Sequence, residues 1–197
     1  MTRTTAPDGA ERAWRALAAL LPPHLAGQVL DCWSIGEQEA GLGLLVSGLD
    51  DESVPISEET RALLSATAED WGVREALETG IAGCRPLPGD ASPVRLLRAP
   101  ETAPLPAGAV AGRPDLSALV LVPWITRTPP SCGRLLARAH GREPWGGLSY
   151  LAEAYVVLAP EGHGRTLVLD PADAQDAQDA QDALAALIPC EECAGFR

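Results

Sequence analysis

Two cysteines near the end of the sequence, Cys190 and Cys193, are separated by two glutamates. Two thiolates at this spacing can supply half of a structural zinc site, which also needs a second pair of ligands close together in the sequence. The other candidate ligands are scattered along the chain, at Cys84, Cys132, His140 and His163. The sequence leaves metal binding by the cysteine pair open, and it predicts no metal ligand and no cofactor.

The segment Gly147-Leu-Ser149-Tyr-Leu151 has the form of the first half of a nucleophile elbow, the turn that exposes a catalytic serine. In that turn a second glycine leaves room for the neighbouring strand, and Leu151 stands in its place here. A serine nucleophile also needs a base, usually histidine, and the three histidines are far apart in the sequence. We therefore expect no catalytic residue and predict that the protein is not an enzyme.

Two glutamates and two glycines lie close together in Glu37-Gln-Glu39-Ala-Gly41-Leu-Gly43. Residues two apart on a helix are separated by about 200° around its axis, so the two carboxylates cannot act on one substrate. The glycines lack the third glycine and the preceding strand of a dinucleotide-binding fingerprint. Gly41 and Gly43 indicate instead the close approach of another helix, either from the protein's own core or from a partner.

Acidic side chains are unevenly distributed. The net charge of −12 argues against nucleic-acid binding, because affinity for phosphates comes from clustered Lys and Arg. Residues 1–84 carry a net charge of −9, residues 85–169 carry +3, and residues 170–197 carry −6. A protein with such acidic segments is suited to a basic partner.

The first part of the chain predicts a helical bundle. Apolar residues recur at helical spacing over residues 10–21, and Pro22-Pro23 ends that helix and begins another. The segment Ser34-Ile-Gly-Glu37 has the form of a capping box, which would begin a third helix. That helix would bury the stripe Leu42, Leu45, Val46 and Leu49. Ser57 would cap a fourth helix, and a short helix would follow over about residues 73–81.

The rest of the chain predicts strands. Residues 85–114 are rich in proline and glycine and are expected to form a linker or a long loop. Apolar runs of strand length cover residues 116–124, 155–158 and 166–169, and the last two predict a β-hairpin.

Two helices are expected in this second part. One is a short helix over residues 132–139, and the other is an acidic helix that starts at Asp170-Pro171 and runs to Ile188. The predicted fold is α+β, with a helical bundle over residues 1–84 and a small antiparallel sheet with one or two helices over residues 115–197.

The sequence from Trp33 to Leu45, followed by Leu49-Asp-Asp-Glu52 and Pro55-Ile-Ser-Glu-Glu59, resembles immunity proteins of bacterial toxin systems, of the MafI and CdiI types. The similarity covers about residues 30–75. The resemblance implies a cytoplasmic protein that binds and neutralises a cognate toxin, often a nuclease. With the acidic cluster, it gives these candidate partner-binding residues: Trp33, Glu39, Asp50, Asp51, Glu52, Glu58, Glu59, Glu69 and Asp70.

The predicted function is therefore inhibition of a basic toxin domain through an acidic surface. We expect no nucleic-acid partner and no membrane insertion, because the first residues lack the apolar core of a signal peptide and no apolar run reaches membrane-spanning length. Two alternatives stay open: a protein-binding or scaffold module without catalytic activity, and a zinc-dependent or hydrolytic enzyme.

Overall fold

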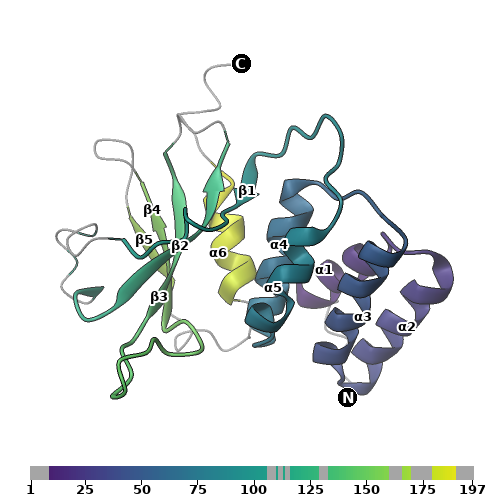
Figure 1. The fold of residues 1–197 in the computed structure, drawn as a ribbon, viewed down its shortest axis with the longest axis horizontal. Coiled ribbons are helices and arrows are strands. Elements are labelled where there is room, and N and C mark those ends of the chain that lie inside the picture. Colours follow the sequence, from purple (N-terminus) through teal and green to yellow (C-terminus); the bar gives the residue numbers. More distant parts are fainter. Residues whose placement is uncertain are drawn as a thin grey trace, which may run out of the picture. The chain divides into compact units, whose positions relative to one another are not determined.

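The protein is described by a computed structural model, in which residues 9–105, 110, 113, 116–128, 133–159, 166–169 and 179–189 are placed. The chain divides into two compact units, Met1–Ala91 and Ser92–Arg197. In the described residues the first unit contains five helices, and the second contains a five-stranded antiparallel sheet and one helix (Figure 1). The predicted α+β fold is confirmed.

The helices of the first unit are α1 (Gly9–Ala18), α2 (Pro23–Ile35), α3 (Gln38–Asp51), α4 (Glu58–Asp70) and α5 (Arg74–Gly83). Helix α3 packs against α2 and α5, and α1 packs against α2 and α4. The predicted apolar stripe of α3 is buried, as are Trp14 of α1 and Leu64 of α4. Burial of these large side chains is the main stabilising contribution to the bundle.

The turn between α2 and α3 corrects the predicted capping box. Ser34 lies inside α2, where its hydroxyl donates to the carbonyl oxygen of Asp31 at 2.8 Å. Helix α3 begins at Gln38, and Glu37 precedes it without a side-chain cap. Gly36 ends α2 in the left-handed conformation, with φ at 85°. Because glycine adopts this conformation without a steric penalty, α2 continues past Ser34 and ends at the glycine instead.

Two other local predictions are confirmed. The Ser57 hydroxyl accepts a hydrogen bond from the backbone amide of Thr60 and caps α4. Gly41 lies where another helix approaches closely: a Cβ added there would lie 2.6 Å from Cζ2 of Trp14 and 2.9 Å from Cβ of Cys32. The close neighbour at Gly41 is therefore the protein's own core. At Gly43, by contrast, an added Cβ would meet no atom of the described residues within 4 Å.

The second unit contains β1 (Val94–Leu96), β2 (Val120–Arg127), β3 (Leu135–His140), β4 (Ala154–Leu158), β5 (Leu167–Leu169) and α6 (Asp179–Leu187). The strands lie in sequence order, and each pairs antiparallel with its neighbour. Strands β4 and β5 form the predicted hairpin. Helix α6 packs against β3 and β4.

The structure differs from the sequence prediction at two strands. The helix expected over residues 132–139 is wrong, because residues 135–140 form β3. Leu, Ala and Arg favour helices, but β3 lies between β2 and β4 and bonds to both, so its tertiary pairing overrides local propensity. Strand β1 lies within the segment predicted as a linker or loop. The expected start of the last helix, at Asp170-Pro171, falls outside the described residues.

Candidate functional site

Three exposed carboxylates lie at the C-terminal end of α3. Asp50 and Asp51 are in its last turn and Glu52 is its C-cap residue, and we call these three residues the α3 acidic end. That turn contains no basic residue. A helix C-terminus carries a partial negative charge, so carboxylates there are electrostatically unfavourable. Among the residues that the structure places, none of the three takes part in an ion pair.

Backbone hydrogen bonds hold the turn that follows the α3 acidic end. The amide of Ser53 donates to the carbonyl of Asp50, and the amide of Val54 donates to the carbonyl of Leu49, each at 2.9 Å. Ile56 then exchanges backbone hydrogen bonds with the segment after α5, at Arg85 and Leu87. The carboxylates therefore project from a backbone that is fixed on both sides, which limits the conformational entropy lost when a partner binds.

The acids at the start of α4 have a structural role. Glu58 and Glu59 lie in the first turn, where negative charge is favourable. The carboxylate of Glu58 pairs with Arg61 at 3.0 Å. A further acid, Asp90, accepts a hydrogen bond from the amide of Glu58 at 2.6 Å. The sequence prediction missed Asp90 because it lies 32 residues from the helix that it caps, and no local pattern connects the two.

Glu69 is not on the surface, although it was a candidate partner-binding residue. It is 4% exposed and pairs at 2.9 Å with Arg74, itself 7% exposed. Arg74 also pairs with Glu75 at 2.7 Å. Burial of a carboxylate is tolerated because the guanidinium is buried with it. Glu69 therefore stabilises the interior of the helical unit, while Asp70 beside it is half-buried.

Arg61 is also buried inside the helical unit, with none of its surface exposed. Its guanidinium donates to the carbonyl oxygens of Ile81 and Cys84 at the end of α5, the latter at 2.8 Å. The last carbonyls of a helix have no partner within that helix, so Arg61 satisfies two of them from α4. With Arg61 and Arg74 buried, the described surface of this unit keeps three arginines, Arg12, Arg15 and Arg85.

Trp33 and Glu39 lie apart from the α3 acidic end. The Trp33 ring is half-buried between Trp14 and Trp71, with ring centroids 5.3 Å and 6.0 Å away. Glu39 is exposed in the first turn of α3. Glu39 and Asp50 are eleven positions apart on the helix, which is roughly 16 Å along the axis. The structure thus keeps Asp50, Asp51 and Glu52 together and separates them from Trp33 and Glu39.

The only candidate nucleophile considered from the sequence, Ser149, has structural contacts. Its hydroxyl donates to the carbonyl of Leu151 at 2.9 Å and accepts from the amide of Gly141 at 3.1 Å. The buried His140 places Nδ1 2.9 Å from the carbonyl oxygen of Ser149. His140 therefore contacts the backbone of Ser149, which is a contact that positions the loop.

The described residues include no group of three or more His, Cys, Asp or Glu side chains arranged to hold a metal ion. Cys132, His163, Cys190 and Cys193 lie outside the described residues. Cys84 is buried, and burial raises the pKa of its thiol above the ordinary 9.0, outweighing the nearby charge of Arg61.

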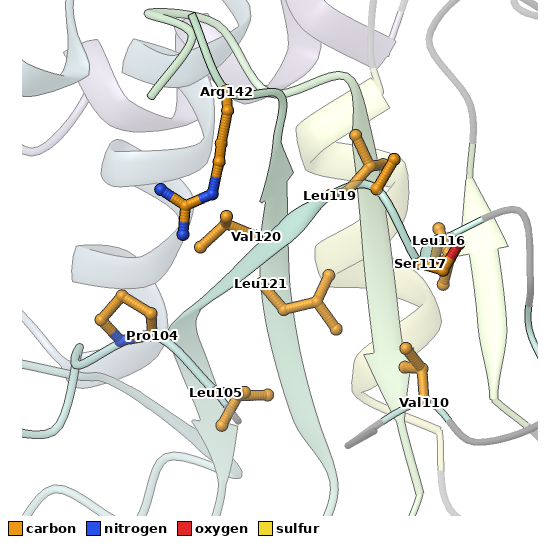
Figure 2. Close-up of a pocket in the computed structure, with 10 residues that line it drawn as sticks. Pro104, Leu105, Val110, Leu116, Ser117, Leu119, Val120, Leu121 and Arg142 are labelled. Atoms are coloured by element: carbon orange, nitrogen blue, oxygen red, sulfur yellow. The ribbon is translucent and has the colours of Figure 1, made fainter. Parts of the chain in front are cut away.

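The sheet unit has a hollow beside β2, with a volume of about 360 Å³, which we call the β2 pocket. Its walls are formed by β2, the segments before it, and one residue of the loop after β3 (Figure 2). The lining residues are Pro104, Leu105, Val110, Leu116, Ser117, Ala118, Leu119, Val120, Leu121 and Arg142. The sequence prediction did not find this pocket, because its lining comes from separate segments that meet only in the fold.

Comparison of the chain with protein families, with curated proteins and with solved structures gives no match. Within the described residues, no helix has both the length and the apolar character needed to cross a membrane.

Proposed function

We propose that this protein binds and neutralises a basic protein toxin, as the immunity partner of a bacterial toxin–immunity pair, and that the α3 acidic end is its main contact. The observation that carries the proposal is the position of Asp50, Asp51 and Glu52 at the negative end of a helix dipole. Such charges cost the folded state about 0.3–1 kcal/mol each, so the fold alone does not account for them.

A basic partner accounts for them in two ways. Lys or Arg side chains of the partner would neutralise the three carboxylates together with the partial charge of the helix terminus, and so offset the cost in the complex. The excess of exposed acids over exposed arginines in this unit would also accelerate encounter with a positively charged protein. Nuclease toxins carry basic surfaces for phosphate, which makes them suitable partners. The proposal places the protein in the cytoplasm, where such a toxin would act.

The test compares two variants that each remove three negative charges. The first, D50N/D51N/E52Q, removes the α3 acidic end. The second, D31N/E37Q/E39Q, removes three exposed acids that lie at the end of α2 and the start of α3. Both are titrated against the toxin encoded beside this protein, with association rate, affinity and neutralisation measured at several salt concentrations.

We expect D50N/D51N/E52Q to bind more slowly and more weakly, with a flatter salt dependence, yet to be about 1 kcal/mol more stable to denaturant. The control D31N/E37Q/E39Q should retain most of the affinity and gain no stability. Equal losses of affinity in both variants would show that overall charge, and not the α3 acidic end, attracts the partner. If the neighbouring toxin is neither bound nor neutralised, the immunity function itself is wrong.

A further inference from the structure

Most residues that line the β2 pocket have apolar side chains. Leu121 and Leu116 belong to a buried cluster that includes Ala137 and Ala139 of β3 and Val156 of β4. Leu105, Val110 and Leu119 pack against this cluster and are only partly buried. They form the exposed side of an otherwise closed hydrophobic core. A ligand with an apolar body would gain free energy by covering these side chains, since they still contact water.

One side chain in the lining carries a charge. Arg142 lies in the loop after β3, and it extends along the pocket beside Val120 (Figure 2). Its backbone is held by a bridge to Leu148. Among the placed residues, no carboxylate pairs with its guanidinium. The pocket therefore combines an apolar wall with a cation whose hydrogen-bond donors are available to a ligand.

We propose that the β2 pocket binds a small amphipathic anion, in which one carboxylate is joined to a compact apolar body. The carboxylate would accept charge-assisted hydrogen bonds from Arg142, and the apolar body would lie against Leu105, Leu119 and Leu121. The volume of about 360 Å³ lies within the range of small-molecule sites, about 300–1,000 Å³.

The lining discriminates against other ligand classes. A fully hydrated anion such as inorganic phosphate would lose water against the leucine walls, and one guanidinium would not compensate for that loss. A cationic ligand would meet Arg142 as a like charge. A neutral apolar molecule would gain the same wall contacts but would leave Arg142 without a partner. The combination of one cation and an apolar wall therefore selects a monovalent amphiphile.

The proposal can be tested on the full chain with three probes of matched size, octanoate, 1-octanol and octylammonium, and with inorganic phosphate as a fourth titrant. Isotope-labelled protein is titrated with each, and amide chemical-shift changes give both the affinity and the location of binding. We expect octanoate to shift amides of β2 and of the flanking segments and to bind more tightly than 1-octanol. Octylammonium and inorganic phosphate should cause no shifts there.

Two variants and a matched control locate the interaction. Arg142→Gln should weaken the binding of octanoate on the order of tenfold and leave the affinity for 1-octanol unchanged, because only the charged hydrogen bonds are lost. Ala118 is exposed in the lining, so Ala118→Phe should fill the pocket and abolish binding of both probes. Arg98→Gln removes an exposed arginine of the same unit outside the pocket and should have no effect.

Three results would overturn the proposal: octanoate shifts that map elsewhere, equal affinity of Arg142→Gln and the unaltered protein for octanoate, or equal affinity for octanoate and 1-octanol. Near-ultraviolet circular dichroism checks that each variant is folded. The D50N/D51N/E52Q protein should bind octanoate normally, because those residues are in the helical unit. The proposal for the pocket and the proposal for the partner surface can therefore be disproved independently of each other.

Discussion

The two units use their arginines differently, although each buries two: Arg61 and Arg74 in the helical unit, and Arg127 and Arg138 in the sheet unit. In the helical unit, Arg61 and Arg74 are buried and bind carboxylates and backbone carbonyls of their own unit. In the sheet unit, Arg142 is exposed beside an apolar pocket, and the Arg134 guanidinium donates to the carbonyls of Ala186 and Pro189 near the end of α6. Arg74 thus neutralises a buried carboxylate inside the helical unit, whereas Arg142 provides surface charge on the sheet unit.

This difference changes how the charge of the sequence is interpreted. An arginine that is paired with a carboxylate of its own unit adds little net charge to the field that a partner meets, whereas an unpaired acid at the surface contributes fully. The field outside the helical unit is consequently set by its unpaired exposed acids, among them Asp50, Asp51 and Glu52. The sheet unit keeps a cation where a ligand can reach it. Surface electrostatics therefore depend on which charges the fold buries, and only secondarily on how many there are.

The largest expected effect tests whether Arg61 is structural and Arg142 is not. The substitution Arg61→Met keeps much of the side-chain volume but leaves the carbonyls of Ile81 and Cys84 and the carboxylate of Glu58 without this partner. Loss of one partner of a buried charged network costs about 3–5 kcal/mol. The same change at the exposed Arg142 should alter the free energy of unfolding by less than about 0.5 kcal/mol.

Urea denaturation, followed by far-ultraviolet circular dichroism, measures both changes. Arg15→Met gives a further control within the helical unit, because Arg15 is exposed and its ion pair with Glu11 is a surface contact. Such pairs contribute about 0–1 kcal/mol. Should Arg61→Met prove no more destabilising than Arg15→Met, the internal role of Arg61 would be disproved.

A second prediction compares glycines with close neighbours in each unit. At Gly41 an added methyl group would collide with the ring of Trp14, which is 1% exposed and held within the core. At Gly141 it would collide with the carboxylate of Glu153, which is the mobile end of an exposed side chain. Gly41→Ala should therefore cost about 1–3 kcal/mol, as overpacking of a core does, while Gly141→Ala should cost much less.

Thermal and urea denaturation of the two alanine variants test this difference. Gly43→Ala is the matched control on the same helix as Gly41. Because an added Cβ at Gly43 meets none of the placed atoms within 4 Å, the gain in helix propensity should raise stability by up to about 1 kcal/mol. Equal losses at Gly41 and Gly43 would mean that helix α3 does not pack against Trp14 as described.

The sequence was sufficient for two locally determined features, although not for the turn at Ser34–Glu37. The stripe from Leu42 to Leu49 repeats with the period of a helix, and the hydroxyl of Ser57 lies three residues from the amide that it caps, so both were predictable. Strand β1 was not predictable, because three residues become a strand only through pairing with β2. Strand β3 was predicted as a helix for the same reason, since its partners lie elsewhere in the chain.

The candidate sites show the same limit. The sequence indicated the acids of the helical unit, but it could not show that Glu69 points inward to Arg74 or that Asp90 caps α4. Both facts depend on side-chain direction and on contacts between segments. The β2 pocket depends on contacts as well, because Arg142 follows β3 while the rest of the lining precedes or belongs to β2. The charge pattern of the sequence therefore predicts a kind of partner, but only the fold shows which charged residues are exposed to it.

The smallest expected effect concerns Cys84, beside the buried Arg61. Burial raises the pKa of its thiol most strongly, Arg61 lowers it, and Asp50 raises it, for a net increase above 9.0. As pH rises past 9.0, the thiol in the unfolded chain loses its proton while the folded protein retains it, so alkaline conditions favour unfolding.

The unaltered protein should thus lose stability over this pH range more steeply than the Cys84→Ala variant does. Urea midpoints measured in steps from neutral to alkaline pH would give the two slopes. Parallel slopes would show that Cys84 is accessible to water. Desolvation in the interior of the helical unit would then not act on its thiol, and the predicted contrast with the exposed Arg142 of the sheet unit would be lost.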